Sequence, residues 1–301
     1  MIKASSQPMW WIVIGGVAMT LFPTPAQAQP SPSGTEIFLA RLTQRAGRIS
    51  LALPKNITNR PGYDNQPSFT PDGQGILYTL IKEDGRADIY RYDLKSGRIY
   101  QVTKTAESEY SALVTPDGRH FSVVRVELDS TQRLWRFEMS GNKPELVLAG
   151  VKPVGYYAWC NPAAVALFVL GNPSTLQVSN IQTGSAQVVS KNIGRSIQKI
   201  PGRNAASFVD KISEREWWIS QVDCSTLMTT SLIRTLPGSE FHAWMSDGTL
   251  LMARESKLFA WKPGSEGSWE EIADLSAAGI RNITRIAVSP KGNALALVAS
   301  D

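Results

Sequence analysis

Short runs in which hydrophobic and polar residues alternate fill most of the chain after residue 35. In Asp88–Thr103, DIYRYDLKSGRIYQVT, two such runs are joined by a Ser-Gly turn. Alternation with a period of two, rich in aromatic and β-branched residues, predicts half-buried β-strands. The pattern therefore indicates antiparallel hairpins and an all-β fold.

The pattern recurs about every 45 residues. The segment Ser68–Leu80, SFTPDGQGILYTL, agrees in polarity at each position with Ala158–Leu170, AWCNPAAVALFVL. The residues that take the place of the Asp in the TPDG phrase in successive copies are Asp72, Asp117, Pro162, Gly202, Asp247 and Lys291. A second hairpin follows the first in each complete copy. Four short antiparallel strands in about 45 residues are typical of one propeller blade. We therefore predict a six-bladed β-propeller of four-stranded antiparallel blades.

The sixth copy contains only two of its four strands. The segment Thr35–Leu53, near the other end of the chain, matches the second hairpin of the complete copies. We predict that these N-terminal strands complete the C-terminal blade and close the ring with main-chain hydrogen bonds, which leaves no unfinished blade. The predicted propeller domain spans residues 36–301.

The first 28 residues predict a cleaved signal peptide. Lys3 is the only charge before residue 36, and the apolar run Met9–Phe22 is shorter than a membrane span. Ala26-Gln27-Ala28 supplies the small residues of a cleavage site, so we expect the cut after Ala28 and a flexible tail over residues 29–35. This predicts a periplasmic or secreted protein without a transmembrane segment in the mature chain.

The net charge and the two cysteines bear on nucleic-acid binding and on disulfide formation. The net charge is +5, but the basic residues form no run or helical stripe, so we predict no nucleic-acid partner. Export permits disulfides. However, Cys160 is expected on the innermost strand of one blade and Cys224 at the outer end of a third strand in the next. We expect these positions to be too far apart for a disulfide and the cysteines to be free thiols.

The TPDG phrase has the chemistry of a turn. Proline presets φ, aspartate accepts hydrogen bonds from the backbone that follows, and glycine adopts positive φ. Because three of the six copies lack the aspartate, we interpret the phrase as a repeated turn rather than a metal or catalytic site.

Candidate catalytic residues are few. The chain has no G-x-S-x-G motif, and His120 and His242 have no partner at metal-ligand spacing. We expect no catalytic residue, no metal site and no cofactor. His120 is expected at a strand edge, and His242 at the start of an innermost strand, in a position to face the channel mouth.

The phrases QPSFTPDGQGILYT and DIYRYDLKSGRIYQVT resemble the repeat of TolB-type, WD40-like propellers, whose blades read approximately P-x-F-S-P-D-G, I-x-F, D-I-Y-x-x-D and L-T. The resemblance covers Glu36–Asp301. TolB-type proteins carry an α/β domain before the propeller, so the chain resembles the propeller portion only, as a divergent member.

The resemblance implies an exported, non-catalytic module that binds a protein or peptide of the cell envelope, and we expect a monomer. The alternative is a propeller that binds a carbohydrate or another small ligand, including a divergent polysaccharide lyase, because lyases acting on pectic oligosaccharides resemble this fold.

The loops that enter the innermost strands of a propeller gather around one mouth of its channel. The residues expected at this rim, as ligand or partner contacts, are Asp64, Glu109, Tyr156, Arg195, Glu240 and His242. Mixed charges with interleaved aromatic residues suit a protein or peptide partner.

Overall fold

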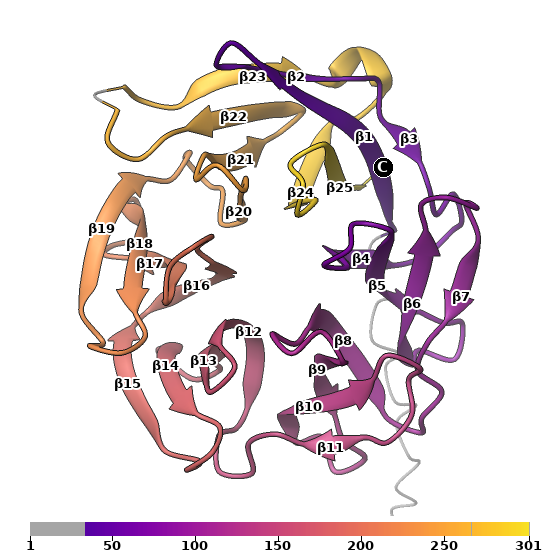
Figure 1. Ribbon diagram of the computed structural model, residues 1–301, viewed down its shortest axis with the longest axis vertical. Helices are drawn as coiled ribbons and strands as arrows, with labels where there is room; N and C mark the ends of the chain where they lie inside the picture. Colours follow the sequence, from indigo (N-terminus) through magenta and orange to yellow (C-terminus); the bar gives the residue numbers. More distant parts are fainter. Residues whose placement is uncertain (1–33, 266, 301) are drawn as a thin grey trace, which may run out of the picture. The chain divides into compact units, whose positions relative to one another are not determined.

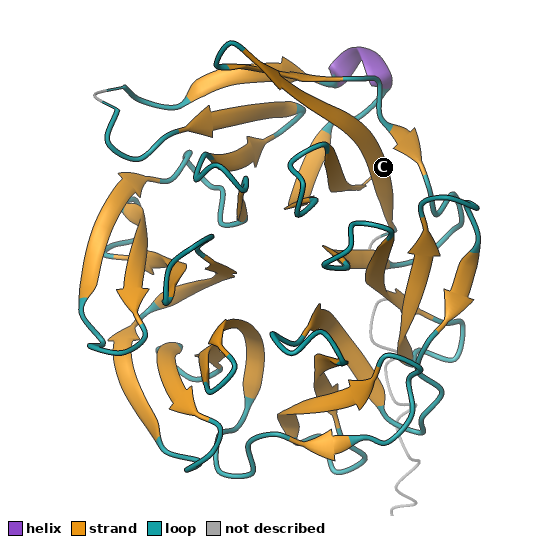
Figure 2. Cartoon of the chain, in the orientation of Figure 1, coloured by secondary structure: helices purple, strands orange, loops and turns teal. Residues whose placement is uncertain are grey.

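The alternating segments form β-strands in the computed structural model, which describes residues 34–265 and 267–300. They make six antiparallel sheets arranged around a central axis (Figure 1). The described residues contain one short 3-10 helix, η1 (Ser276–Ala278), and otherwise strands and turns (Figure 2). The predicted all-β, six-bladed propeller is confirmed.

The first three blades are continuous in sequence, and each begins with its innermost strand. Blade 1 consists of β4 (Asp64–Phe69), β5 (Gly75–Ile81), β6 (Ala87–Asp93) and β7 (Ile99–Gln101). Blade 2 consists of β8 (Ser108–Val114), β9 (His120–Val126), β10 (Gln132–Glu138) and β11 (Glu145–Leu146). Blade 3 consists of β12 (Val154–Asn161), β13 (Ala164–Val169), β14 (Thr175–Asn180) and β15 (Ala186–Lys191).

Blades 4 and 5 follow the same plan, and blade 6 joins the two ends of the domain. Blade 4 consists of β16 (Ile193–Lys199), β17 (Ala205–Lys211), β18 (Trp217–Asp223) and β19 (Thr229–Arg234). Blade 5 consists of β20 (His242–Trp244), β21 (Leu250–Arg254), β22 (Lys257–Trp261) and β23 (Glu270–Asp274). Blade 6 consists of β24 (Asn282–Val288), β25 (Ala294–Ser300), β1 (Thr35–Arg45) and β2 (Arg48–Leu51), with the short β3 (Lys55–Asn56) also paired to β1.

The ring closes as the sequence predicts. Strand β1 pairs antiparallel with β25 in seven consecutive residue pairs, from Thr35 opposite Ser300 to Arg41 opposite Ala294. The N-terminal hairpin thus supplies the two outer strands of the blade that the C-terminal hairpin begins. Blade 6 is therefore held together by hydrogen bonds between the two ends of the domain.

The TPDG phrases form the predicted hairpin turns. In blade 1 the N–H of Gly73 donates to the carbonyl of Thr70 (2.8 Å), and the N–H of Gln74 donates to the carboxylate of Asp72 (2.9 Å). Gly73 has a φ of +69°, which glycine adopts without strain. The equivalent bonds recur in blade 2 at Gly118. The aspartate is thus occupied by its own turn.

The hydrophobic core lies between neighbouring blades. Phe121 and Phe137 of blade 2 are fully buried, with ring centroids 5.4 Å apart, and pack against Leu77 and Ile89 of blade 1. Both faces of a blade are covered in this way, so a second strand such as β5 (GILYTLI) is apolar at nearly every position. The blades hold one another in place and thereby fix the walls of the central channel.

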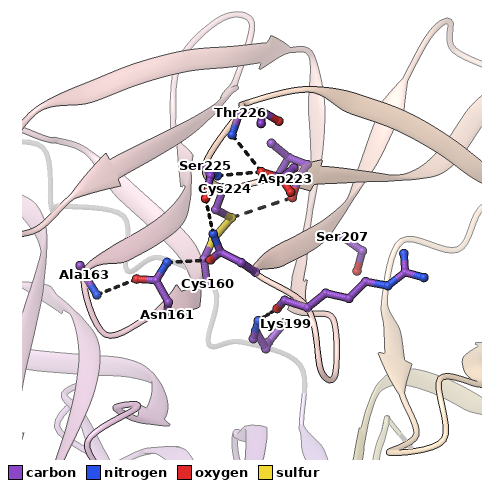
Figure 3. Close-up of a disulfide and its surroundings, with 12 residues drawn as sticks. Cys160, Asn161, Ala163, Lys199, Ser207, Asp223, Cys224, Ser225 and Thr226 are labelled. Carbon is purple, nitrogen blue, oxygen red and sulfur yellow. Dashed lines mark hydrogen bonds between the residues drawn. A yellow bond between two sulfur atoms is a disulfide. The ribbon is translucent and has the colours of Figure 1, made fainter.

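The expectation of free thiols at Cys160 and Cys224 is wrong, because the two residues form a disulfide with a Cα–Cα distance of 6.3 Å (Figure 3). Cys160 lies near the end of β12, and Cys224 directly follows β18. These strands run in the same direction, and their ends meet in one buried cluster between blades 3 and 4. The prediction took strand order as distance from the axis. It neglected the twist of each sheet, which brings the end of a third strand over the preceding blade.

The predicted signal peptide (residues 1–28, cut after Ala28) lies outside the described residues. Within residues 34–265 and 267–300, no helix has the length and hydropathy needed to cross a membrane.

Candidate functional site: the central channel

A channel of about 910 Å³ passes between the innermost strands, and all six blades contribute to its wall. One residue from each blade lies at the same place in the repeat, six positions before the residue aligned with Asp72. We call these residues the channel ring: Gln66, Ser111, Tyr156, Ser196, Phe241 and Arg285. The ring is thus a product of the repeat, although its six side chains differ in chemistry.

Irregular strand pairing turns these residues toward the channel. Five of the six innermost strands (all except β20) shift register against their second strand close to the ring position. In β4 the shift falls between Asn65 and Ser68, where Gln66 has a φ of +58°. In β8 the equivalent Ser111 has a φ of +55°. An extra residue in one strand re-aims the side chains around it, so the innermost strands bulge at the level of the ring.

An arginine and two aromatic residues cross the channel at the ring. The guanidinium carbon of Arg285 lies 3.9 Å from the ring centre of Phe241 and 5.0 Å from that of Tyr156. Its Nη2 donates to the hydroxyl of Tyr156 at 2.9 Å. Arg285 comes from β24 of blade 6 and Tyr156 from β12 of blade 3, on opposite sides of the ring (Figure 1). The guanidinium is therefore held within the channel rather than against one wall.

A second arginine stands beside this cluster. The guanidinium carbon of Arg195 lies 5.6 Å from the ring centre of Phe241, and its Nε donates to the Glu240 carboxylate at 2.9 Å. Lys211 pairs with the other oxygen of Glu240. Burial alone would raise the pKa of Glu240, but hydrogen bonds from Lys211 and Arg195 hold it below its usual value. Glu240 is therefore ionised and already shared between two cations.

The channel wall carries more positive than negative charge. Its charged residues are Arg195, Lys199, Arg285 and Asp117. Asp117 belongs to a TPDG turn at the far end of the channel, where its carboxylate accepts hydrogen bonds from that turn. Among the described residues, no carboxylate lies within 4.0 Å of the Arg285 guanidinium. Burial raises the pKa of Tyr63, a neighbour of Arg285, to about 12, so no phenolate is present to balance the charge.

Of the six residues predicted at the rim, Tyr156, Arg195 and Glu240 lie together in this cluster. Asp64 and Glu109 are fully buried and do not line the channel. Asp64 pairs with Arg60 at 3.1 Å, and Glu109 pairs with Arg125 at 3.2 Å.

His242 lines the channel through a buried position between blades 4 and 5. Its Nε2 lies 2.7 Å from the Oγ of Ser207, which also accepts a hydrogen bond from Nε1 of Trp244 (2.8 Å). Burial lowers the pKa of His242 to about 4, so the ring is neutral at pH 7. A serine beside a histidine is the beginning of a nucleophilic site, but Ser207 and His242 both have no exposed surface. The pair instead joins the two blades.

Phe241 and Arg285 were not among the residues predicted at the rim. Phe241 lies between the predicted rim residues Glu240 and His242, and no rim residue was predicted in blade 6. Aligning every copy on the turn residue and comparing the sixth position before it would have found both side chains. In the described part of the chain, no three His, Cys, Asp or Glu side chains are placed to hold a metal ion.

No model of a known protein family matches the chain. Among solved structures, a protein assigned as TolB from Agrobacterium tumefaciens has a TM-score of 0.69 and 14% identity, over 90% of this chain and 99% of that one. This chain is structurally similar to the TolB propeller. A chain of a nidogen–laminin complex has a TM-score of 0.62 at 12% identity, over 84% of this chain and 98% of that one.

The fold is also shared with an enzyme. Oligogalacturonate lyase from Vibrio parahaemolyticus has a TM-score of 0.51 and 12% identity, over 89% of this chain and 98% of that chain. At such identities the TolB, nidogen–laminin and lyase structures share only the fold with this chain, and fold alone does not determine function.

Proposed function

We propose that this chain is an exported, non-catalytic, TolB-like propeller that binds a protein or peptide of the cell envelope at the mouth of its channel. The mouth is the side of the ring on which the innermost strands begin. The proposal includes a periplasmic or secreted location and a monomeric state. The similarity to TolB and to a chain of a nidogen–laminin complex supports a binding module of this shape.

Exposed aliphatic side chains on the mouth side carry the proposal. Leu128, Leu170 and Ile212 occupy the hairpins between the second and third strands of blades 2, 3 and 4, and are 78%, 42% and 60% exposed. The strand registers place these hairpins beside the starts of β8, β12 and β16. Large apolar side chains exposed on one side of a protein are a common feature of protein interaction sites.

Charge reversal at these hairpins tests the docking surface. We expect the double variant Leu128→Asp, Ile212→Asp to lose a partner that the wild-type protein captures from cross-linked envelope extract, because a carboxylate cannot enter an apolar interface without a large desolvation cost. Quantitative mass spectrometry of the captured proteins measures the loss, which we expect to be at least about tenfold.

Met228→Asp is the matched control. Met228 is 70% exposed and lies in the turn after β18, on the opposite side of the ring. This variant should capture the partner as well as the wild type does. Capture by the double variant at the wild-type level, or no partner from either protein, would contradict the proposal.

Binding of a carbohydrate or another small ligand is the second candidate. The channel volume of about 910 Å³ lies within the range of small-molecule sites, and an oligogalacturonate lyase shares the fold. Stabilisation of the wild-type protein by oligogalacturonate in a thermal-shift assay, with no captured protein, would favour this candidate over the first.

A further inference from the structure

We propose that the channel ring binds a carboxylate of an extended acidic peptide segment, and that Arg285 is the residue that holds it. This inference rests on the proposed function and names the chemistry of the partner. The partner would dock on the aliphatic hairpins and insert its acidic segment into the channel.

The charge of Arg285 is not balanced by a carboxylate of the described residues. Glu240 is shared by Arg195 and Lys211, and no carboxylate of the described residues reaches Arg285. A half-buried guanidinium has lost part of its hydration without gaining a counter-ion. An anion that enters the channel therefore gains a charge-assisted hydrogen bond and restores the balance of charge.

Most N–H donors of the Arg285 side chain have no partner among the described residues. A guanidinium has five N–H groups in a planar fork. In the described residues, the one hydrogen bond that the side chain makes is to the hydroxyl of Tyr156. Phe241 and Tyr156 fix the position of the group, so little side-chain entropy remains to be lost on binding. A prepositioned fork with unused donors matches the two oxygens of a carboxylate.

The surroundings of Arg285 also favour an anion with polar neighbours. Arg195 lies next to the same Phe241 ring, with 57% of its side chain exposed, and adds a second positive charge at the mouth. Ser111 of the channel ring contributes a shielded hydroxyl with no hydrogen-bond partner among the described residues. A confined wall with a positive balance concentrates the potential on its axis. A peptide segment with further polar groups beside its carboxylate would match both the positive potential of the channel and the unpaired hydroxyl of Ser111.

The exposed aliphatic side chains favour a peptide over an acidic sugar. Leucine and isoleucine side chains offer no flat ring for stacking on a sugar and no group that bonds its hydroxyls, whereas they pack well against apolar side chains of a protein. Leu128, Leu170 and Ile212 lie on the same side of the ring as the Arg285 cluster. A partner that combines an apolar body with an acidic segment fits both surfaces.

The test uses the purified full chain and two fluorescein-labelled, amidated peptides, Gly-Asp-Leu-Asp-Ile-Asp-Gly and its counterpart with Asn in place of Asp. Fluorescence polarisation measures Kd. We expect the Asp peptide to bind at least about tenfold more tightly than the Asn peptide, because a charged hydrogen bond is worth more than a neutral one. Higher salt should reduce this difference.

Variants assign the effect to Arg285. Arg285→Gln should weaken binding of the Asp peptide about tenfold or more, and Arg285→Lys should weaken it less because the charge remains but the fork is lost. Arg281→Gln is the matched control, since it removes an exposed arginine directly before the same strand, and its Kd should change less than about twofold. Thermal unfolding confirms that each variant is folded.

Several results would overturn the inference. These are equal Kd values for the two peptides on the wild type, equal effects of Arg285→Gln and Arg281→Gln, or thermal stabilisation by oligogalacturonate with no peptide binding. If Arg285→Gln does not fold, Arg285→Lys and the comparison of the two peptides on the wild type still test the inference. Capture of an envelope partner without a preference for the Asp peptide would leave the proposed function standing and refute this inference. Peptide binding that depends on Arg285, without a captured envelope partner, would support this inference and contradict the proposed function.

Discussion

Three buried titratable side chains, His242, Asp64 and Glu109, lie beside or between the innermost strands and give the fold its own response to pH. Burial lowers the pKa of His242 to about 4 and raises the pKa of Asp64 and of Glu109 to about 6 in each case, although Arg60 and Arg125 oppose the shift of the two carboxyls. Each group is thus shifted toward its neutral form. As the pH falls, the histidine lowers the free energy of unfolding, whereas the two carboxyls raise it.

The contribution of His242 can be isolated by substitution. Its pKa in the folded state lies below the unfolded value of about 6.5, so between pH 6.5 and 4 the unfolded chain binds a proton that the folded chain does not. The stabilisation is therefore present above pH 6.5 and is lost as the pH falls. We expect wild-type protein to lose about 2 kcal/mol relative to His242→Gln between pH 7 and 5, measured by denaturant unfolding.

The comparison with His242→Gln is necessary because Asp64 and Glu109 bind protons more readily in the folded state and so stabilise it as the pH falls below about 6. Both carboxyls are present in the two proteins, and their effect cancels in the difference. Unfolding free energies that follow parallel pH curves in the wild type and the variant would contradict a buried neutral histidine.

At the scale of the elements, the stability of the propeller resides in the contacts between blades. Phe137 of β10 has no exposed surface and lies in the cluster that joins blades 1 and 2. The outer strand β7 instead exposes Tyr100, at 47%. Aromatic residues at these two places should differ greatly in their contribution to the free energy of unfolding.

Phe137→Ala should lower the free energy of unfolding by about 3–5 kcal/mol, because it leaves a cavity between two sheets that cannot collapse independently. Tyr100→Ala is the control and should cost less than about 1 kcal/mol. Chemical denaturation followed by tryptophan fluorescence measures both. Similar losses for the two variants would show that the outer strands carry as much stability as the inter-blade clusters.

The strand elements and their turns were predictable because period-two alternation and turn residues are local signals. The side to which each side chain of the innermost strands points was not predictable in this way. Asp64 lies two residues before Gln66, and a regular strand would turn both to the same side, but the shift between Asn65 and Ser68 breaks the alternation. A single extra residue reverses the faces of a strand. Asp64 and Glu109, which were expected at the rim, are therefore buried, and Gln66 and Ser111 of the channel ring follow them by two residues.

At the scale of the whole molecule, the blade count and the closure between the ends were predictable, since they follow from the number of repeats and from two half-copies. The disulfide was not, because a distance between two blades depends on sheet twist, which sequence spacing does not report. The same limit applies to the contact between Arg285 and Tyr156, which are 129 residues apart.

The disulfide should stabilise the whole ring. It connects residues 64 positions apart. In the chain-entropy description, closing a loop of this length raises the free energy of the unfolded chain by about 4 kcal/mol. We therefore expect the double variant Cys160→Ala, Cys224→Ala to have a markedly lower denaturant midpoint than the oxidised wild type.

Reducing agent provides the control for this prediction. Dithiothreitol should lower the midpoint of the wild type toward that of the double variant and leave the double variant unchanged. A wild-type midpoint that does not respond to the reductant, although the thiols are shown to be free, would contradict the expected stabilisation.

The pairing of β1 with β25 also affects the order in which the molecule forms. The paired residues Thr35 and Ser300 are about 265 positions apart, so this ladder must await a very long loop closure, whereas the other blades assemble from neighbouring hairpins. During synthesis β1 leaves the ribosome long before its partner strand exists. The N-terminal hairpin is therefore the segment most in need of shielding in the nascent protein, and blade 6 is the last to form.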